Sequence, residues 1–145
     1  MKALLQRVSE ASVTVAGERI AGIGPGLLVF LGVEPDDGAE QSDWLAAKTL
    51  ALRIFPDADK PMNRSVTDLD GEVLVVSQFT LAADTGRGNR PGFSSAAPPE
   101  LAQRLYEDFV SRLRARHLRI ATGRFGADMQ VALVNDGPVT FLLER

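Results

Sequence analysis

Alternating apolar and polar residues open the chain and predict a β-strand. Leu4, Val8 and Val13 recur among polar neighbours before a turn at residues 16–18, and such alternation is typical of a strand with one buried face. Short apolar runs bounded by turn-forming residues predict further strands. We place these at residues 20–23, 27–33, 72–79, 129–134 and 139–143.

Helical spacing of apolar residues predicts two helices. The first follows the turn at residues 35–38, with Asp36 or Asp37 available as its cap. Its apolar positions are Trp44, Ala47, Ala51 and Ile54. The second begins at about Pro99, since proline suits the first turn of a helix. Its stripe consists of Leu101, Leu105, Phe109 and Leu113, widened by Ala102, Tyr106 and Val110.

These elements predict one domain over residues 1–145. The length of 145 residues and the composition, 45% hydrophobic and 24% charged, are those of a single globular domain. Many short strands with two helices indicate an α/β fold of the α+β type, in which a curved, mostly antiparallel sheet or partial β-barrel carries both helices. No apolar run is long enough to span a bilayer, and the N-terminus lacks the apolar core of a signal peptide. We therefore expect a cytoplasmic protein without membrane contact.

The scarcity of cysteine and histidine restricts the chemistry. The chain has no cysteine and a single histidine, His117, so thiol nucleophiles, disulfides and multi-histidine zinc sites within one chain are excluded. No G-x-S-x-G sequence accompanies the histidine, as it does in many serine hydrolases. We expect no metal and no cofactor, and any catalysis has to proceed without these devices.

Charge is unevenly distributed along the chain. The net charge is −3, yet arginines gather in the second half, at Arg87, Arg90, Arg104, Arg112, Arg114, Arg116, Arg119 and Arg124. A basic face can bind phosphates even on an acidic protein, because local potential decides binding. The alternative is a solvated helix surface. The loop at residues 84–93 adds Phe93 to two of these arginines, a mixture that suits phosphates and a stacked base as well as an ordinary surface loop.

Two polar segments are candidates for a site. Ser77-Gln78-Phe79-Thr80 ends an apolar strand, which would place donors and acceptors on a rigid element, although these groups could also satisfy loop backbone. In the second segment, Asn135-Asp136-Gly137 is an ordinary hairpin sequence, but Pro138 follows it directly. About 5–6% of X-Pro bonds are cis, so both isomers stay open. A cis bond would turn two consecutive carbonyls in nearly the same direction.

Together these segments resemble one family, the D-aminoacyl-tRNA deacylases, almost from end to end. Its two signature motifs are Ser77-Gln78-Phe79-Thr80 and Asn135-Asp136-Gly137-Pro138-Val139-Thr140. Further matching blocks are residues 6–8, 11–13, 24–28, 52–55, 60–65, 88–93 and 125–129. Several specific blocks in the same order make coincidence improbable.

The resemblance implies hydrolysis of the ester bond of D-aminoacyl-tRNA, and we also expect hydrolysis of glycyl-tRNA. It implies a homodimer with active sites at the interface, in which Gly137-Pro138, as a cis pair, enters the partner's pocket and excludes L-amino acids. Arg7 would orient that pair, and the substrate's 2′-hydroxyl would assist the attacking water. In the pocket, the catalytic strand end would be Ser77, Gln78, Phe79 and Thr80, with Phe125 and Met129 beside the terminal adenosine. Arg87 and Arg90 are the candidate tRNA contacts.

Two other classes of function compete with this interpretation. A non-catalytic RNA-binding module would explain the arginines but not the uncharged strand end. A small-molecule esterase with Thr80 or Ser77 as its nucleophile would need a base, and His117 is expected at a helix end. We expect Thr80 to position the substrate rather than to attack it.

Overall fold

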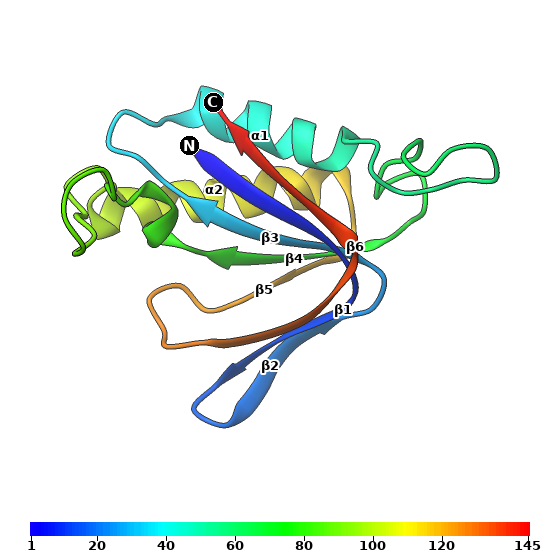
Figure 1. The fold of residues 1–145 in the computed structure, drawn as a ribbon, viewed down its shortest axis with the longest axis horizontal. Helices are drawn as coiled ribbons and strands as arrows, with labels where there is room; N and C mark the ends of the chain where they lie inside the picture. The colour runs from blue at the N-terminus through cyan, green and yellow to red at the C-terminus, as the bar shows by residue number, and fades with distance from the viewer.

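The computed structural model describes all residues from Met1 to Arg145. One strongly curved, six-stranded mixed sheet carries two helices on the same side (Figure 1). Its elements are β1 (Lys2–Val15), β2 (Glu18–Ile23), β3 (Gly26–Gly32), α1 (Ala39–Ala51), β4 (Glu72–Ser77), the 3₁₀ turn η1 (Phe79–Ala82), α2 (Pro99–Arg116), β5 (Ile120–Thr122) and β6 (Gln130–Glu144). This architecture confirms the predicted fold class. No helix combines the length and apolar character that crossing a membrane requires.

The sheet has the order β2-β1-β3-β4-β5, and β6 pairs with β1. The strands β2, β3 and β6 run antiparallel to β1, whereas β3–β4 and β4–β5 are parallel pairs. Strands β3 and β4 consist mainly of apolar residues because both of their faces are buried. On one face Leu27 and Val75 pack under the helices, and on the other Leu28 and Leu74 belong to a second, smaller core.

The face of α1 that contacts the core differs from the prediction. Trp44, Ala47 and Ala51 are exposed, and the buried residues of the helix are Ser42, Leu45, Ala46, Thr49 and Leu50. Alanine fits either face of a helix, so the spacing of Trp44 with two alanines selected the wrong one. Trp44 instead lies under the guanidinium of Arg145, 5.5 Å from its ring centroid.

The predicted cap of α1 is also wrong. The N-cap residue is Gly38, whose N–H donates to Gln41 Oε1 at 3.0 Å. The carboxylate of Asp37 instead accepts the Glu34 N–H at 2.7 Å, which stabilises the turn before the helix.

The predicted hairpin at residues 135–137 is absent. The two runs that flank it form one continuous strand, β6, which pairs with β1 along both its halves. Gln6 pairs with Thr140 and Val8 with Asn135, so four residues of β6 bulge out opposite Arg7. An Asp-Gly sequence indicates only that the backbone can turn easily. Here that turn forms a bulge within one strand instead of a hairpin between two strands.

Glu72, the first residue of β4, joins the turn between β2 and β3 to the segment between α2 and β5. Its carboxylate accepts the Gly24 N–H at 2.5 Å and pairs with Arg119 at 3.2 Å. The Gly24 hydrogen bond, followed by Arg119, lowers the pKa of Glu72 below its usual value. The ionised carboxylate therefore stabilises the fold above the unfolded-state pKa of about 4.3, and this stabilisation is lost as the pH falls through the lower folded-state pKa.

We expect Glu72→Gln to reduce the free energy of unfolding by about 1 kcal/mol at neutral pH and by less at pH 3. Urea denaturation of both proteins at the two pH values measures this difference. An equal loss at both values would contradict the ionic role of Glu72.

Candidate functional site

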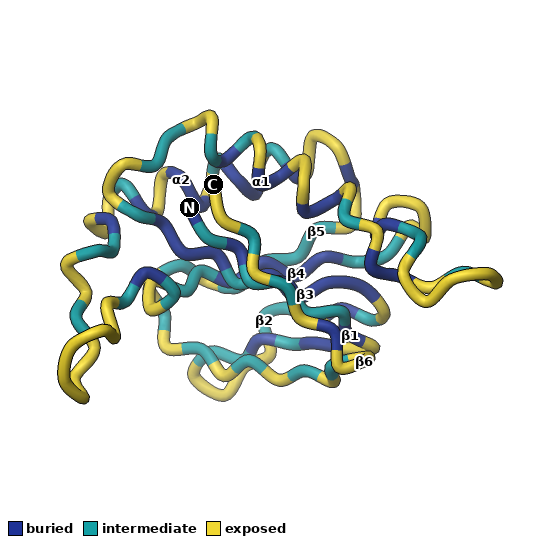
Figure 2. Tube along the Cα trace, turned by 45° about the horizontal axis from the view of Figure 1, so that its top comes forward, coloured by how far each residue is buried: buried dark blue, intermediate teal, exposed yellow.

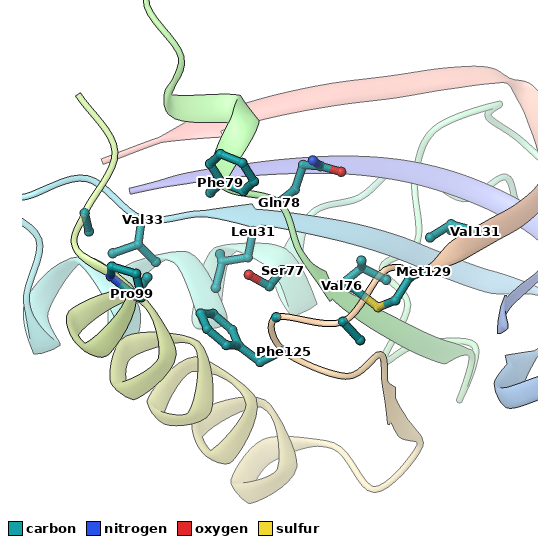
Figure 3. A pocket seen from close by; sticks show the side chains of 14 residues that line it. Leu31, Val33, Val76, Ser77, Gln78, Phe79, Pro99, Phe125, Met129 and Val131 are labelled. Carbon is teal, nitrogen blue, oxygen red and sulfur yellow. The ribbon is translucent and has the colours of Figure 1, made fainter. Parts of the chain in front are cut away.

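A pocket of about 480 Å³ opens where β3 and β4 end against the first turn of α2 (Figure 3). This volume lies in the usual range for small-molecule sites. Its floor comes from the strand ends, through Leu31, Val76 and Ser77, and one wall comes from the turn before β6. The remaining lining residues are Val33, Gln78, Phe79, Ala97, Pro99, Ala102, Phe125, Gly126, Ala127, Met129 and Val131.

The end of β4 brings polar groups to this pocket. Ser77 pairs with Leu31 of β3, and the Gln78 N–H donates to the Leu31 carbonyl at 2.8 Å, which extends the parallel ladder by one residue. The chain then turns into η1. Phe79 and Thr80 begin this turn, so their N–H groups have no acceptor within it.

Thr80 occupies a different place from the other residues of its motif. Its side chain is exposed and does not line the pocket. Its Oγ1 accepts a hydrogen bond from the Gln78 side-chain amide at 2.6 Å. No acid or base side chain hydrogen-bonds to Thr80, so nothing in this chain activates the hydroxyl as a nucleophile.

Phe125 and Met129 form the wall contributed by the turn before β6, with Phe125 toward α2 and Met129 next to Val76 (Figure 3). The Phe125 ring packs on Tyr106 of α2, with centroids 5.9 Å apart and planes tilted by 46°. The Tyr106 hydroxyl donates to the Val75 carbonyl at 3.0 Å, and burial raises the pKa of Tyr106 to about 12. The neutral phenol thus fixes Phe125 relative to β4. The apolar stripe of α2 predicted Tyr106 only as a core residue, so its support of Phe125 was not predicted.

The Met129 side chain packs against the backbone of Gly123 and Arg124, at the start of the turn that forms this wall. Its sulfur lies 3.4 Å from the Arg124 N–H, which donates to it. A Cβ at Gly123 would lie 2.8 Å from the same sulfur, closer than real contacts allow. Glycine at this position therefore lets the thioether close the pocket beside Phe125.

The pocket contains no charged side chain. Its polar side-chain groups are the Ser77 hydroxyl and the Gln78 amide. His117 ends α2 outside the pocket, where its Nε2 pairs with the Gly71 carbonyl at 2.6 Å. No three His, Asp or Glu side chains cluster closely enough to hold a metal ion. Chemistry in this pocket therefore depends on hydroxyl, amide and backbone groups.

The second motif forms the bulge of β6, outside this pocket. Gly137 and Pro138 are exposed, and the peptide bond between them is cis. The Asn135 side chain closes the bulge from within: its Nδ2 donates to the carbonyls of Arg7 and Val139, and its Oδ1 accepts the Val139 N–H, each at 3.0 Å. Asn135 belonged to the motif, but its clamping role was not predicted.

Arg7 supports the same bulge from β1. Its Nε donates to the Asp136 carbonyl at 2.8 Å and its Nη1 to the Ile54 carbonyl at 2.7 Å. These two bonds join the residue before Gly137 to the start of the segment that follows α1. The guanidinium thus positions the bulge without reaching the pocket.

Arg87 and Arg90 are exposed and belong to the segment between η1 and α2. This segment is the lime-green loop at one end of the molecule in Figure 1, where the chain of Figure 2 is coloured largely as exposed. Neither arginine takes part in an ion pair or hydrogen bond. The structure therefore brings Ser77, Gln78, Phe79, Phe125 and Met129 together in one pocket. Thr80, Arg7, Gly137, Pro138, Arg87 and Arg90 lie outside it within a single chain.

Comparison with known proteins gives one consistent result. The family model described as D-Tyr-tRNA(Tyr) deacylase matches residues 4–144. The chain is 59% identical to the D-aminoacyl-tRNA deacylase of Syntrophotalea carbinolica over 144 residues, covering 99% of this chain and 97% of that protein. It is 60% identical to the D-aminoacyl-tRNA deacylase of Klebsiella pneumoniae, with 99% of each chain covered.

Solved structures show the same fold. The structure of a c-Myc DNA unwinding element binding protein superimposes with a TM-score of 0.96 at 44% identity, covering 100% of this chain and 99% of that one. A probable eukaryotic D-amino acid tRNA deacylase superimposes with a TM-score of 0.85 at 17% identity, over 98% and 97% of the two chains. At that lower identity the second likeness shows the fold alone.

Proposed function

Since this chain belongs to the D-Tyr-tRNA(Tyr) deacylase family, we propose that it hydrolyses the ester that joins a D-amino acid to the 3′ end of tRNA. The observation that carries this assignment is 59–60% identity to curated D-aminoacyl-tRNA deacylases over 99% of the chain. The resemblance seen in the two motifs is thereby confirmed. Release of D-tyrosine from D-tyrosyl-tRNA by the purified chain tests the assignment, and no release would refute it.

The pocket supports the assignment through its size and lining. We infer that it receives the terminal adenosine, with the base beside Phe125 and Met129 and the ester near Ser77 and Phe79. An apolar pocket of about 480 Å³ with few polar groups suits a base and a ribose. Tyr106 holds the Phe125 ring in place for this contact.

Catalysis in this account needs no covalent nucleophile. Aminoacyl esters are activated, so a placed water can attack the carbonyl carbon directly. The C–O bond to the ribose then breaks, and the ribose oxygen leaves with a proton, with the adjacent 2′-hydroxyl assisting. The free N–H groups of Phe79 and Thr80 are the candidate donors to the developing oxyanion. One such donor is worth about 2.7–4 kcal/mol in enzymes that use it.

We assign the selection of D-aminoacyl over L-aminoacyl substrates to the bulge of β6. The carbonyls of Gly137 and Pro138 would accept the substrate's α-ammonium and leave no space for an L side chain. A clash of this kind discriminates better than a lost apolar contact. Glycine has no side chain to exclude, so glycyl-tRNA is also expected to be hydrolysed.

This selection requires two copies of the chain. Gly137 and Pro138 are exposed and do not line the pocket of their own chain. We therefore propose a homodimer in which each bulge completes the partner's pocket, as in an isologous interface. Analytical ultracentrifugation gives the mass directly, and an active monomer would contradict this arrangement.

Thr80→Ala is expected to lower kcat by less than about tenfold, since the hydroxyl contributes positioning of an ordinary hydrogen-bond strength. Its Oγ1 contacts only the Gln78 amide, and no base is within reach. Single-turnover hydrolysis of D-tyrosyl-tRNA, with Thr80→Ser as the matched control, measures the effect. Loss of all turnover with normal tRNA binding would instead identify Thr80 as a nucleophile.

A further inference from the structure

Two exposed aromatic rings lie together at the rim of the pocket. Phe79 is 54% exposed and Phe93 is 46% exposed, and their ring centroids are 5.1 Å apart with planes tilted by 55°. Phe79 also lines the pocket, so this pair, the aromatic ledge, continues the pocket surface outward. Contiguous exposed apolar surface, unlike apolar residues scattered singly, is typical of ligand-binding surfaces.

The ledge is fixed by backbone and side-chain hydrogen bonds. Asp84 and Gly92 exchange two backbone hydrogen bonds of 2.8 Å, which close the loop just before Phe93. After it, Ser95 Oγ donates to the Ala82 carbonyl, and the Ala97 N–H donates to the Val33 carbonyl at 3.0 Å. Phe93 is thus tied to η1 and to the end of β3, and no reordering is needed before a ligand binds.

Positive charge accompanies the rings. The loop closed by Asp84 and Gly92 carries Arg87 and Arg90, which are exposed and make no ion pair. The Asp84 carboxylate already accepts the Gly86 N–H at 2.9 Å. Aromatic rings next to unpaired arginines are the combination that binds single-stranded nucleic acid, through base stacking and phosphate contacts.

We propose that the aromatic ledge is a stacking subsite for the nucleobase that precedes the terminal adenosine of the substrate. The proposal rests on the proposed function, because the pocket that the ledge continues is the one assigned to that adenosine. The Phe93 ring contacts the base, and Arg87 and Arg90 hold the phosphates that lead to it. The occupant is a base rather than a protein segment because the ledge extends the adenosine pocket and the loop that ends beside Phe93 carries two arginines without ion-pair partners.

The ring of Phe93 permits a matched substitution. Phe93→Leu keeps apolar bulk but removes the aromatic face, and Phe93→Tyr keeps the face. Because the side chain is half exposed, both variants are expected to melt at the temperature of the parent protein. For D-tyrosyl-tRNA, Phe93→Leu is expected to lower kcat/KM roughly tenfold through KM, since one base–aromatic stack has about that effect. Phe93→Tyr is expected to restore the parent value.

The substrate D-tyrosyl-adenosine provides the control, because it has no second base. Its hydrolysis should be unchanged in Phe93→Leu. An equal loss with both substrates would show that the ring serves the pocket and not a second base. No loss with either substrate would also overturn the proposal.

A fluorescence measurement separates the subsite from catalysis. An uncharged RNA hairpin with 2-aminopurine in place of the nucleotide before the terminal adenosine is titrated with each protein. Quenching by the parent protein and by Phe93→Tyr, but not by Phe93→Leu, is expected from a base stacked on the ledge. Absence of quenching by a parent protein that hydrolyses D-tyrosyl-tRNA would overturn the subsite and leave the proposed function standing. Quenching that depends on the Phe93 ring, by a parent protein that does not hydrolyse D-tyrosyl-tRNA, would support the base-stacking site and contradict the proposed function.

Discussion

Replacing Gly137 by alanine is expected to lower kcat/KM for D-tyrosyl-tRNA about a hundredfold, the scale of effect that follows when a positioning group moves by about 1 Å. A Cβ at this position would lie 2.2 Å from the Val139 backbone nitrogen and 2.6 Å from Val139 Cγ2. The same nitrogen donates to Asn135 Oδ1, so relief of the clash opens the clamp that shapes the bulge. The carbonyls assigned to the substrate's ammonium would then be displaced.

The control for this substitution is Gly38→Ala. A Cβ at Gly38 meets only Gln41 Oε1, at the ordinary distance of 3.7 Å, and Gly38 caps α1 away from both the pocket and the bulge. Its activity is expected to equal that of the parent protein. An unchanged kcat/KM in a folded Gly137→Ala protein would show that the bulge does not position the substrate.

Phe125→Ala is the second substitution with a large expected effect. Removing the ring takes away the aromatic surface assigned to the terminal adenine and one partner of the Tyr106–Phe125 contact. We expect KM for D-tyrosyl-tRNA to rise roughly fiftyfold, within the range for loss of a base–aromatic stack. The value of kcat should change little, because the strand end that holds the ester is not altered.

The control is the same substitution at Phe30. This ring lies on β3, packs against the smaller core and does not line the pocket. Loss of stability from a deleted ring should appear in both variants, whereas the rise in KM should appear only in Phe125→Ala. A fall in kcat without a change in KM would show that the wall acts on the chemical step instead of on binding.

The two variants together test the proposed dimer. If each bulge completes the partner's pocket, Gly137→Ala chains keep intact pockets and Phe125→Ala chains keep intact bulges. Subunits exchanged between the two proteins would form mixed dimers with one complete site. The mixture should therefore be more active than the sum of its components. Activity equal to that sum would show that each active site takes its pocket and its bulge from the same chain.

The sequence was most informative where burial leaves a simple pattern. The apolar runs of β3 and β4 were predicted correctly because both faces of these strands are buried, and the stripe from Leu105 to Leu113 correctly identified the core face of α2. The pattern was least informative for α1, whose alanines fit either face, and for β6, in which a turn-forming sequence lies within one continuous strand.

The site shows the same division between local and long-range information. The polar end of β4 could be located because Ser77 and Gln78 directly follow an apolar run. The position of Gly137 and Pro138 outside the pocket of their own chain was expected only from the family resemblance, because it depends on how β6 pairs with β1 and no local pattern of residues encodes it. The support of Phe125 by Tyr106 was equally hidden, because the two residues meet only through packing of α2 against the last turn before β6.

The most direct test of the central claim compares the release of tyrosine from D-tyrosyl-tRNA and from L-tyrosyl-tRNA by the purified chain with a chelator present. We predict rapid release from the D-form and release from the L-form at the uncatalysed rate, with glycyl-tRNA hydrolysed as well. Equal rates for the two hands would contradict selection by exclusion. No release from either, with tRNA still bound, would contradict the enzymatic function and leave a protein that only binds RNA.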